Sequence, residues 1–112
     1  MPIKSRTKST KNIKAIASAP GIVKIAGIQM ASGPHVLANL SEAERLIEIA
    51  VSQGAKLVAL PEYFAIMGLK ETDKIKVREV EGEGPIQRFL AKMAKKHHIW
   101  LIGGSVPLRA SV

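Results

Sequence analysis

One glutamate stands where it could perform acid–base chemistry, because it follows a short apolar run and a proline. Leu57 to Leu60 are four consecutive apolar residues, and Pro61 and Glu62 come directly after them. A carboxylate held among apolar side chains has its charged form disfavoured, which makes it a stronger base. A general base that works near neutral pH needs this property. We therefore expect Glu62 to be catalytic; the alternative is that it binds backbone N–H groups of the following loop.

Two other segments fit their chemical motifs less well. The turn at residues 30–34 lacks both the G-x-G-x-x-G spacing and a phosphate-binding lysine, so we expect no phosphate site there. Residues 103–107 read Gly-Gly-Ser-Val-Pro, and Pro107 replaces the last glycine of the G-x-S-x-G pattern around a nucleophilic serine. We expect these glycines to let the backbone pass close to a strand or a substrate, with a nucleophilic Ser105 as the alternative.

Side chains that bind metals or form thioesters are scarce. The sequence contains no cysteine and three histidines, namely His35, His97 and His98. The lack of cysteine excludes a disulfide, a thiolate metal site and a thiol nucleophile within this sequence. The histidines are too few and too badly spaced for a metal cluster, so we predict no metal site. His97 and His98 fit the end of a helix, where positive charge is favoured.

The elements that must position Glu62 form a β-α-β unit. Residues 22–31 are largely apolar and β-branched, which predicts a first strand. Apolar residues at spacings of three and four predict a helix over about 36–53, which Gly54 can end in a left-handed conformation. Residues 56–60 are typical of an inner strand of a parallel sheet that is covered on both faces. Glu62 would then lie at the carboxyl end of that strand, where open α/β sheets place their ligands.

The second half of the sequence continues the alternation of helix and strand. A weak signal indicates a short helix within residues 72–81, and an amphipathic pattern predicts a helix over 85–96 that begins at Pro85. Residues 99–102 are predicted as the third strand. The fold class is therefore α/β, in the order β-α-β-α-β. Such a sheet has an unpaired edge and an uncovered face, so we expect residues 22–112 to be the N-terminal portion of a larger domain.

The net charge of +8 is concentrated near the N-terminus. The first twenty residues carry five Lys or Arg and no acidic residue, whereas the others carry twelve Lys or Arg against nine Asp or Glu. We interpret residues 1–21 as a flexible basic extension that is solvated, contacts nucleic acid or an acidic partner, or directs the protein to an organelle. We expect a cytoplasmic protein. No run approaches the ~18 apolar residues that a transmembrane helix needs, so we predict no membrane segment.

Several segments together carry a resemblance to a known family. The most distinctive is Leu60-Pro61-Glu62-Tyr63-Phe64 after an apolar strand. The others are Lys24 to Met30, Asn39-Leu40, Gly54 to Val58, Gly84-Pro85, Trp100 and Gly103-Gly104-Ser105. From about Val23 to Leu108, the sequence resembles the nitrilase, or carbon–nitrogen hydrolase, superfamily. Thr72-Asp73-Lys74 and Gly84 to Gln87 add a similarity to its omega-amidase and deaminated-glutathione-amidase type.

The resemblance implies an α-β-β-α sandwich with a catalytic set of Glu, Lys and Cys. In that family, the glutamate at the position of Glu62 takes the proton of the cysteine thiol, which attacks an amide or nitrile carbon and forms a thioester. The lysine stabilises the oxyanion, and a water activated by the glutamate hydrolyses the thioester. The resemblance implies a small-molecule amide or nitrile as substrate, no metal or organic cofactor, and assembly into homo-oligomers.

This sequence departs from the family pattern in one decisive way. It has no cysteine, and none of its lysines matches the catalytic lysine, so only Glu62 carries over. We expect the chain alone to be inactive, with the missing catalytic residues on other polypeptide. The alternatives are a non-catalytic binding module, whose basic N-terminus contacts nucleic acid or a partner protein, and a pseudo-enzyme that pairs with an intact homologue.

Overall fold

The chain folds around a three-stranded parallel sheet. The structure, a computed structural model, describes residues 21–111. The strands are β1 (Ile25–Gly27), β2 (Leu57–Ala59) and β3 (Trp100–Ile102). β2 lies between β1 and β3 and runs parallel to both. The prediction that Glu62 follows an inner strand is therefore confirmed, although each strand is shorter than its apolar run. Nearly all of the predicted basic extension (1–21) lies outside the described residues.

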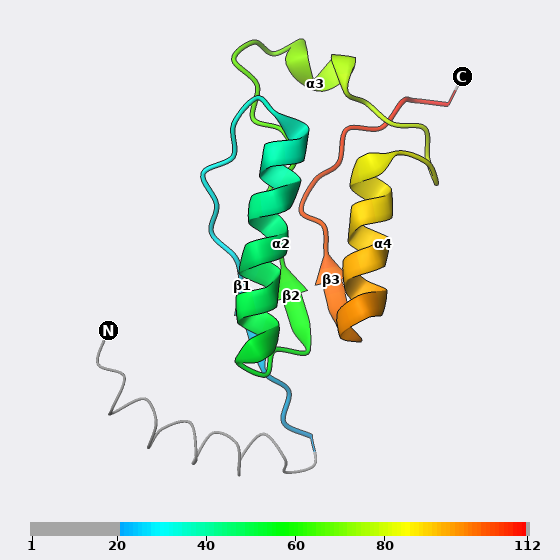
Figure 1. The fold of residues 1–112 in the computed structure, drawn as a ribbon. Helices are drawn as coiled ribbons and strands as arrows, with labels where there is room; N and C mark the ends of the chain where they lie inside the picture. Colours follow the sequence, from blue (N-terminus) through cyan, green and yellow to red (C-terminus); the bar gives the residue numbers. More distant parts are fainter. Residues whose placement is uncertain (1–20, 112) are drawn as a thin grey trace.

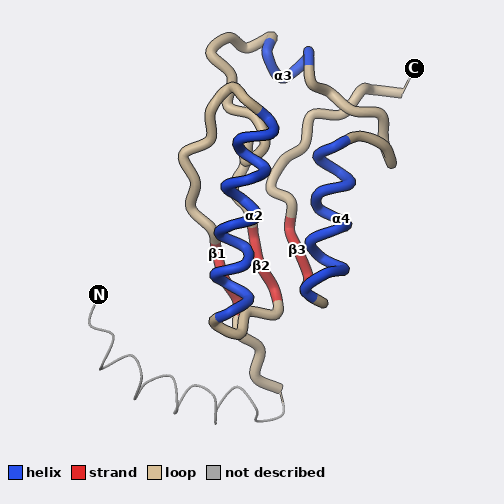
Figure 2. The backbone as a smooth tube through the Cα atoms, viewed as in Figure 1, coloured by secondary structure: helices blue, strands red, loops and turns tan. Residues whose placement is uncertain are grey.

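Two long helices cover one face of this sheet. The helices are α2 (Val36–Ser52), α3 (Asp73–Lys76) and α4 (Pro85–His97). α2 and α4 contact each other and lie over the same face, whereas the single turn of α3 lies beyond the carboxyl ends of the strands (Figure 1). Figure 2 shows how long loops, rather than regular elements, make up this end of the molecule. Within the described part of the chain, no helix is long and apolar enough to cross a membrane.

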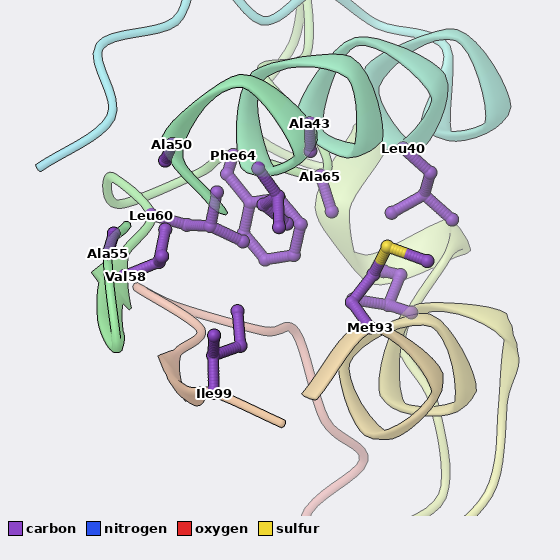
Figure 3. Packing of buried hydrophobic residues seen from close by; sticks show 12 residues of the cluster. Leu40, Ala43, Ala50, Ala55, Val58, Leu60, Phe64, Ala65, Met93 and Ile99 are labelled. Carbon is purple, nitrogen blue, oxygen red and sulfur yellow. The ribbon is translucent and has the colours of Figure 1, made fainter. Parts of the chain in front are cut away.

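The core fills the space between the two long helices and the sheet. Ala43 and Ile47 of α2, Met93 of α4 and Val58 of β2 have no exposed surface. Phe64, from the loop after β2, is equally buried and points into the same cluster (Figure 3). Burying a large apolar side chain contributes about 1.5–3 kcal/mol. The residues just after Glu62 are therefore anchored in the core.

The opposite face of the sheet is open. Ile25 of β1 is 66% exposed, and Trp100 and Ile102 of β3 are 78% and 52% exposed. Successive side chains of a strand point to opposite faces, so these residues mark the face that the helices do not cover. The uncovered face expected from the element count is confirmed. The expectation that the inner strand is covered on both faces is wrong for this chain, because the described residues supply helices for one face only.

Both predicted helix ends are confirmed. Gly54 has φ +92°, and its N–H donates to the Val51 carbonyl at 2.9 Å as the chain leaves α2. α4 begins at Pro85, whose missing N–H costs nothing at a first helical position. The orphan N–H groups that follow bind a buried carboxylate, that of Glu79, which is only 5% exposed.

Glu79 anchors the start of α4 to the loop that follows β3. Its Oε2 accepts the Ile86 N–H at 2.6 Å, and its Oε1 accepts the Gln87 N–H at 3.1 Å. Its backbone N–H donates to the Pro107 carbonyl at 2.9 Å. A negative charge at a helix N-terminus is stabilising, because the helix dipole is positive there. Glu79 thus joins the two segments, because its carboxylate binds the start of α4 and its backbone N–H binds the loop after Ser105.

Candidate functional site at the carboxyl end of the sheet

Glu62 lies where the sequence places it, directly after the central strand. The Leu60 N–H still donates to the Ile102 carbonyl at 2.9 Å, so pairing with β3 continues one residue beyond β2. Pro61 has no N–H and ends this pairing. Glu62 is the next residue and therefore leaves the carboxyl edge of the sheet, the edge at which open α/β sheets bind ligands.

The surroundings of Glu62 differ from the prediction. Its side chain is exposed, not held among apolar neighbours. No residue among 21–111 makes a hydrogen bond or an ion pair with its carboxylate. Glu62 lacks an apolar environment because the hydrophobic core lies between the helices and the sheet, where Phe64 is buried, and does not extend to the position of Glu62. The structural alternative is wrong as well, since the carboxylate binds no backbone N–H group of the following loop.

The turn that carries Glu62 is held from one side by the loop after β3. Tyr63 has φ +55°, a left-handed conformation that costs a residue with a Cβ about 1–2 kcal/mol. Its N–H donates to the Ser105 hydroxyl at 2.8 Å. Gly104 has φ +63°, and a Cβ at this position would overlap the Pro61 carbonyl. The prediction that these glycines allow a close approach of backbone is confirmed for Gly104, whereas a Cβ at Gly103 would meet the side chain of Leu90.

The same turn is held from the other side by the segment between β1 and α2. The Ser32 hydroxyl donates to the Phe64 carbonyl at 2.7 Å. Asn39 is 6% exposed, and its Nδ2 donates to the carbonyls of Gly33 at 2.7 Å and Ala65 at 2.9 Å. Its Oδ1 accepts the Gly33 N–H at 2.9 Å. The backbone on both sides of Glu62 is therefore fixed, while its side chain is free.

A small cavity of about 130 Å³ opens beside this turn. It is lined by Tyr63, Ile66, Lys74, Ser105, Val106 and Pro107. The Lys74 ammonium lies 5.7 Å from the centroid of the Tyr63 ring, within the range of a cation–π interaction. Glu62 is not among the lining residues. The site thus consists of a carboxylate without hydrogen-bond partners and, beside the same turn, an apolar cavity lined by the Ser105 hydroxyl and the Lys74 ammonium.

The loop before α3 is ordered by a carboxylate of α3, the helical turn that supplies Lys74. Asp73 Oδ2 accepts the N–H groups of Leu69 at 2.9 Å and Lys70 at 3.0 Å. The Lys70 N–H is the main cause that lowers the pKa of Asp73 below its ordinary value of 3.8. Burial opposes this shift, and the Leu69 N–H and the charge of Lys76 add to it. Asp73 thus fixes this loop next to Lys74, which lines the cavity.

The other candidate residues do not form a second site. The Ser105 hydroxyl accepts a backbone N–H, so it serves the turn. His98 follows the last residue of α4 with φ +51°, and His97 ends the helix, as predicted. No three His, Cys, Asp or Glu side chains in residues 21–111 come together as a metal site would require. Among the residues that build the site, sequence reasoning missed the conformation of Tyr63 and used Asn39 only as part of a resemblance.

Known proteins are similar to this chain in sequence. Residues 24–111 match the carbon-nitrogen hydrolase family. The deaminated glutathione amidase of Synechocystis is 42% identical over 82 residues, which cover 73% of this chain and 29% of that protein. The chloroplastic omega-amidase of Arabidopsis thaliana is 36% identical over 74 residues, 63% of this chain and 20% of that protein.

A solved structure agrees with these matches. The C. elegans NitFhit protein superposes with a TM-score of 0.60 at 28% identity, over 71% of this chain and 20% of that one. This chain therefore spans less than a third of the length of these relatives, and its mixed α/β architecture with parallel strands is that of the nitrilase-like fold. The chain belongs to the carbon–nitrogen hydrolase family.

Proposed function

We propose that this chain supplies Glu62 as the general base of a carbon–nitrogen hydrolase that acts on a small-molecule amide. The observation that carries the proposal is the placement of Glu62 directly after the central strand, with backbone fixed on both sides and the carboxylate unengaged. A general base must reach a proton on another group, and a carboxylate without partners can do so. An amide is favoured over a nitrile because the Synechocystis and Arabidopsis relatives are named as amidases.

In the proposed reaction, Glu62 takes the proton of a cysteine thiol. The sulfur forms a bond to the carbonyl carbon of the amide, and a lysine stabilises the oxyanion. The C–N bond breaks as the protonated Glu62 returns the proton to the leaving amine. Glu62 then deprotonates a water molecule, which hydrolyses the thioester and regenerates the thiol. The sequence has no cysteine, so the thiol and the lysine come from polypeptide outside these residues.

The exposed carboxylate and the uncovered sheet face support the proposal that the catalytic site is shared between this chain and other polypeptide. The carboxylate of Glu62 is exposed, and the neighbouring sheet face presents Ile25 and Trp100 to solvent. Polypeptide that covers this edge and face would remove water from Glu62. Such desolvation would disfavour its charged form and strengthen it as a base, which is the property expected from the sequence.

A fusion protein tests the proposal. This chain replaces the matched region of the Synechocystis deaminated glutathione amidase, and release of amine from deaminated glutathione is measured. We expect the chain alone to be inactive and the fusion to turn over. Glu62→Gln in the fusion should lower kcat by about 10²–10⁴-fold, the usual contribution of a general base. Glu81→Gln, an exposed glutamate before α4, is the control and should have no effect. Full turnover by the Glu62→Gln fusion would contradict the proposal.

A further inference from the structure

We propose that Ser105 is a positioning residue that sets the direction in which Glu62 leaves the sheet edge. The inference rests on the proposed function of Glu62, but its contacts and its test are independent of catalysis. Ser105 acts through the backbone of Tyr63 and does not touch Glu62 itself.

The loop after β3 follows the end of β2 step by step. Ile102 accepts the Leu60 N–H, Gly104 lies against the Pro61 carbonyl, and Ser105 accepts the Tyr63 N–H at 2.8 Å. Glu62 is thus flanked by two residues that this loop holds. Among residues 21–111, none makes a hydrogen bond or an ion pair with the Glu62 carboxylate that could fix its direction.

Of these three contacts, the hydrogen bond to the Tyr63 N–H is the one that uses a side chain of the loop, that of Ser105. A tyrosine does not favour the left-handed conformation that it has here, with φ +55°. Without an acceptor for its N–H, Tyr63 would lower its conformational free energy by returning to negative φ. Phe64 is anchored in the core and by Ser32, so the change would be taken up before it, at Glu62.

The position of Ser105 is itself restrained by its surroundings. It is partly buried, and Glu79 ties the backbone of neighbouring Pro107 to the start of α4. The loop that carries the acceptor is therefore tied, through Glu79, to the start of α4. We infer that the geometry of Glu62 depends on a hydroxyl 42 residues away from the Tyr63 N–H in sequence.

The test uses NMR on the 112-residue chain, with three serine variants. Ser105→Ala removes the acceptor, Ser105→Thr keeps a hydroxyl, and Ser52→Ala removes a hydroxyl at the far end of α2, where it bonds only to the Ile49 carbonyl. The readouts are amide exchange and the HN–Hα coupling of Tyr63, together with residual dipolar couplings of Glu62. The last of these report the direction of the Glu62 Cα bonds relative to the sheet.

We expect Ser105→Ala to speed exchange of the Tyr63 amide at least about tenfold and to shift the couplings of both residues, while couplings in β1 to β3 stay unchanged. Ser105→Thr should restore the wild-type values, and Ser52→Ala should leave them unaltered. Unchanged Tyr63 and Glu62 couplings in Ser105→Ala would overturn the inference.

A second variant keeps the inference testable if Ser105→Ala does not fold. Gly104→Ala places a methyl group against the Pro61 carbonyl, so it should move the same couplings while Ser105 keeps its hydroxyl. Gly27→Ala, where nothing lies within 4 Å of the added Cβ, is its control. If Ser105→Ala does not fold and Gly104→Ala leaves the Tyr63 and Glu62 couplings unchanged, the inference fails as well. Loss of turnover on Glu62→Gln is a separate result, so failure of the proposed function is distinguished from failure of the positioning role.

Discussion

The side-chain amide of Asn39 donates a hydrogen bond of 2.9 Å to the Ala65 carbonyl, although the two residues are 26 positions apart in sequence. Asn39 lies on α2, and Ala65 follows the turn that carries Glu62. One buried amide thus joins the helix layer to the loop at the carboxyl end of the sheet. This hydrogen bond holds the loop from the side of the helices.

Asn39→Ala should destabilise the chain by about 2–4 kcal/mol, because it removes three hydrogen bonds and leaves buried backbone groups without partners. Denaturant unfolding measures the loss. Ser41→Ala, an exposed position on the same helix, is the control and should stay within about 0.5 kcal/mol of wild type. If both variants unfold at the same denaturant concentration, Asn39 does not hold the loop.

Glu79→Gln should destabilise α4, because it removes the charge that meets the positive end of the helix dipole. We expect a loss of about 0.5–2 kcal/mol in the free energy of unfolding, and a larger loss for Glu79→Ala, which leaves N–H groups of the first turn without partners. Glu83→Gln is the matched control, because this glutamate is exposed and the N–H groups of Ile86 and Gln87 donate to Glu79 instead. Equal stability of the variants at positions 79 and 83 would show that the cap is unimportant.

The loop beside the cavity should loosen in acid. The pKa of Asp73 is lowered in the folded chain, so its charged form stabilises the loop above pH 3.8. This contribution is lost as the pH falls through the lowered pKa. The amide proton shifts of Leu69 and Lys70, the two donors, should therefore move together below that pH, and in Asp73→Asn they should be insensitive to it. Amide proton shifts of Leu69 and Lys70 that do not change with pH in the wild-type chain would contradict this prediction.

Trp100 should report whether the open sheet face is covered. This single tryptophan is 78% exposed, so its fluorescence in the chain alone should be that of water-exposed indole and should be quenched by acrylamide. In the active fusion its emission should shift to shorter wavelength and resist quenching. Shielded emission from the chain alone, with sedimentation as a check for self-association, would show that the face is already covered.

Much of the framework could be predicted because its signals are local. The apolar spacing over 36–53 predicted α2, Gly54 marked its end, and Pro85 marked the start of α4. The proline after the apolar run predicted where β2 stops. Each of these depends on residues within a few positions of one another, where periodicity and backbone preference decide the outcome.

The details of the site depend on contacts that local patterns do not contain. Tyr63 has a left-handed conformation and donates its N–H to Ser105, 42 residues away, and no rule based on neighbouring residues indicates either feature. The burial predicted for Glu62 was wrong, because an apolar strand does not ensure an apolar environment beyond its end. That environment requires polypeptide over the open edge, which the described residues do not provide.

Formation of the acyl-enzyme tests the central claim most directly. The fusion described above is mixed with deaminated glutathione and quenched, and the mass of the peptide that contains the nucleophilic cysteine is followed over time. We predict that the wild-type fusion and Glu81→Gln gain the acyl group, whereas Glu62→Gln gains almost none, because its amide cannot take the thiol proton. Acylation of Glu62→Gln at the wild-type rate would contradict the role of Glu62 as general base.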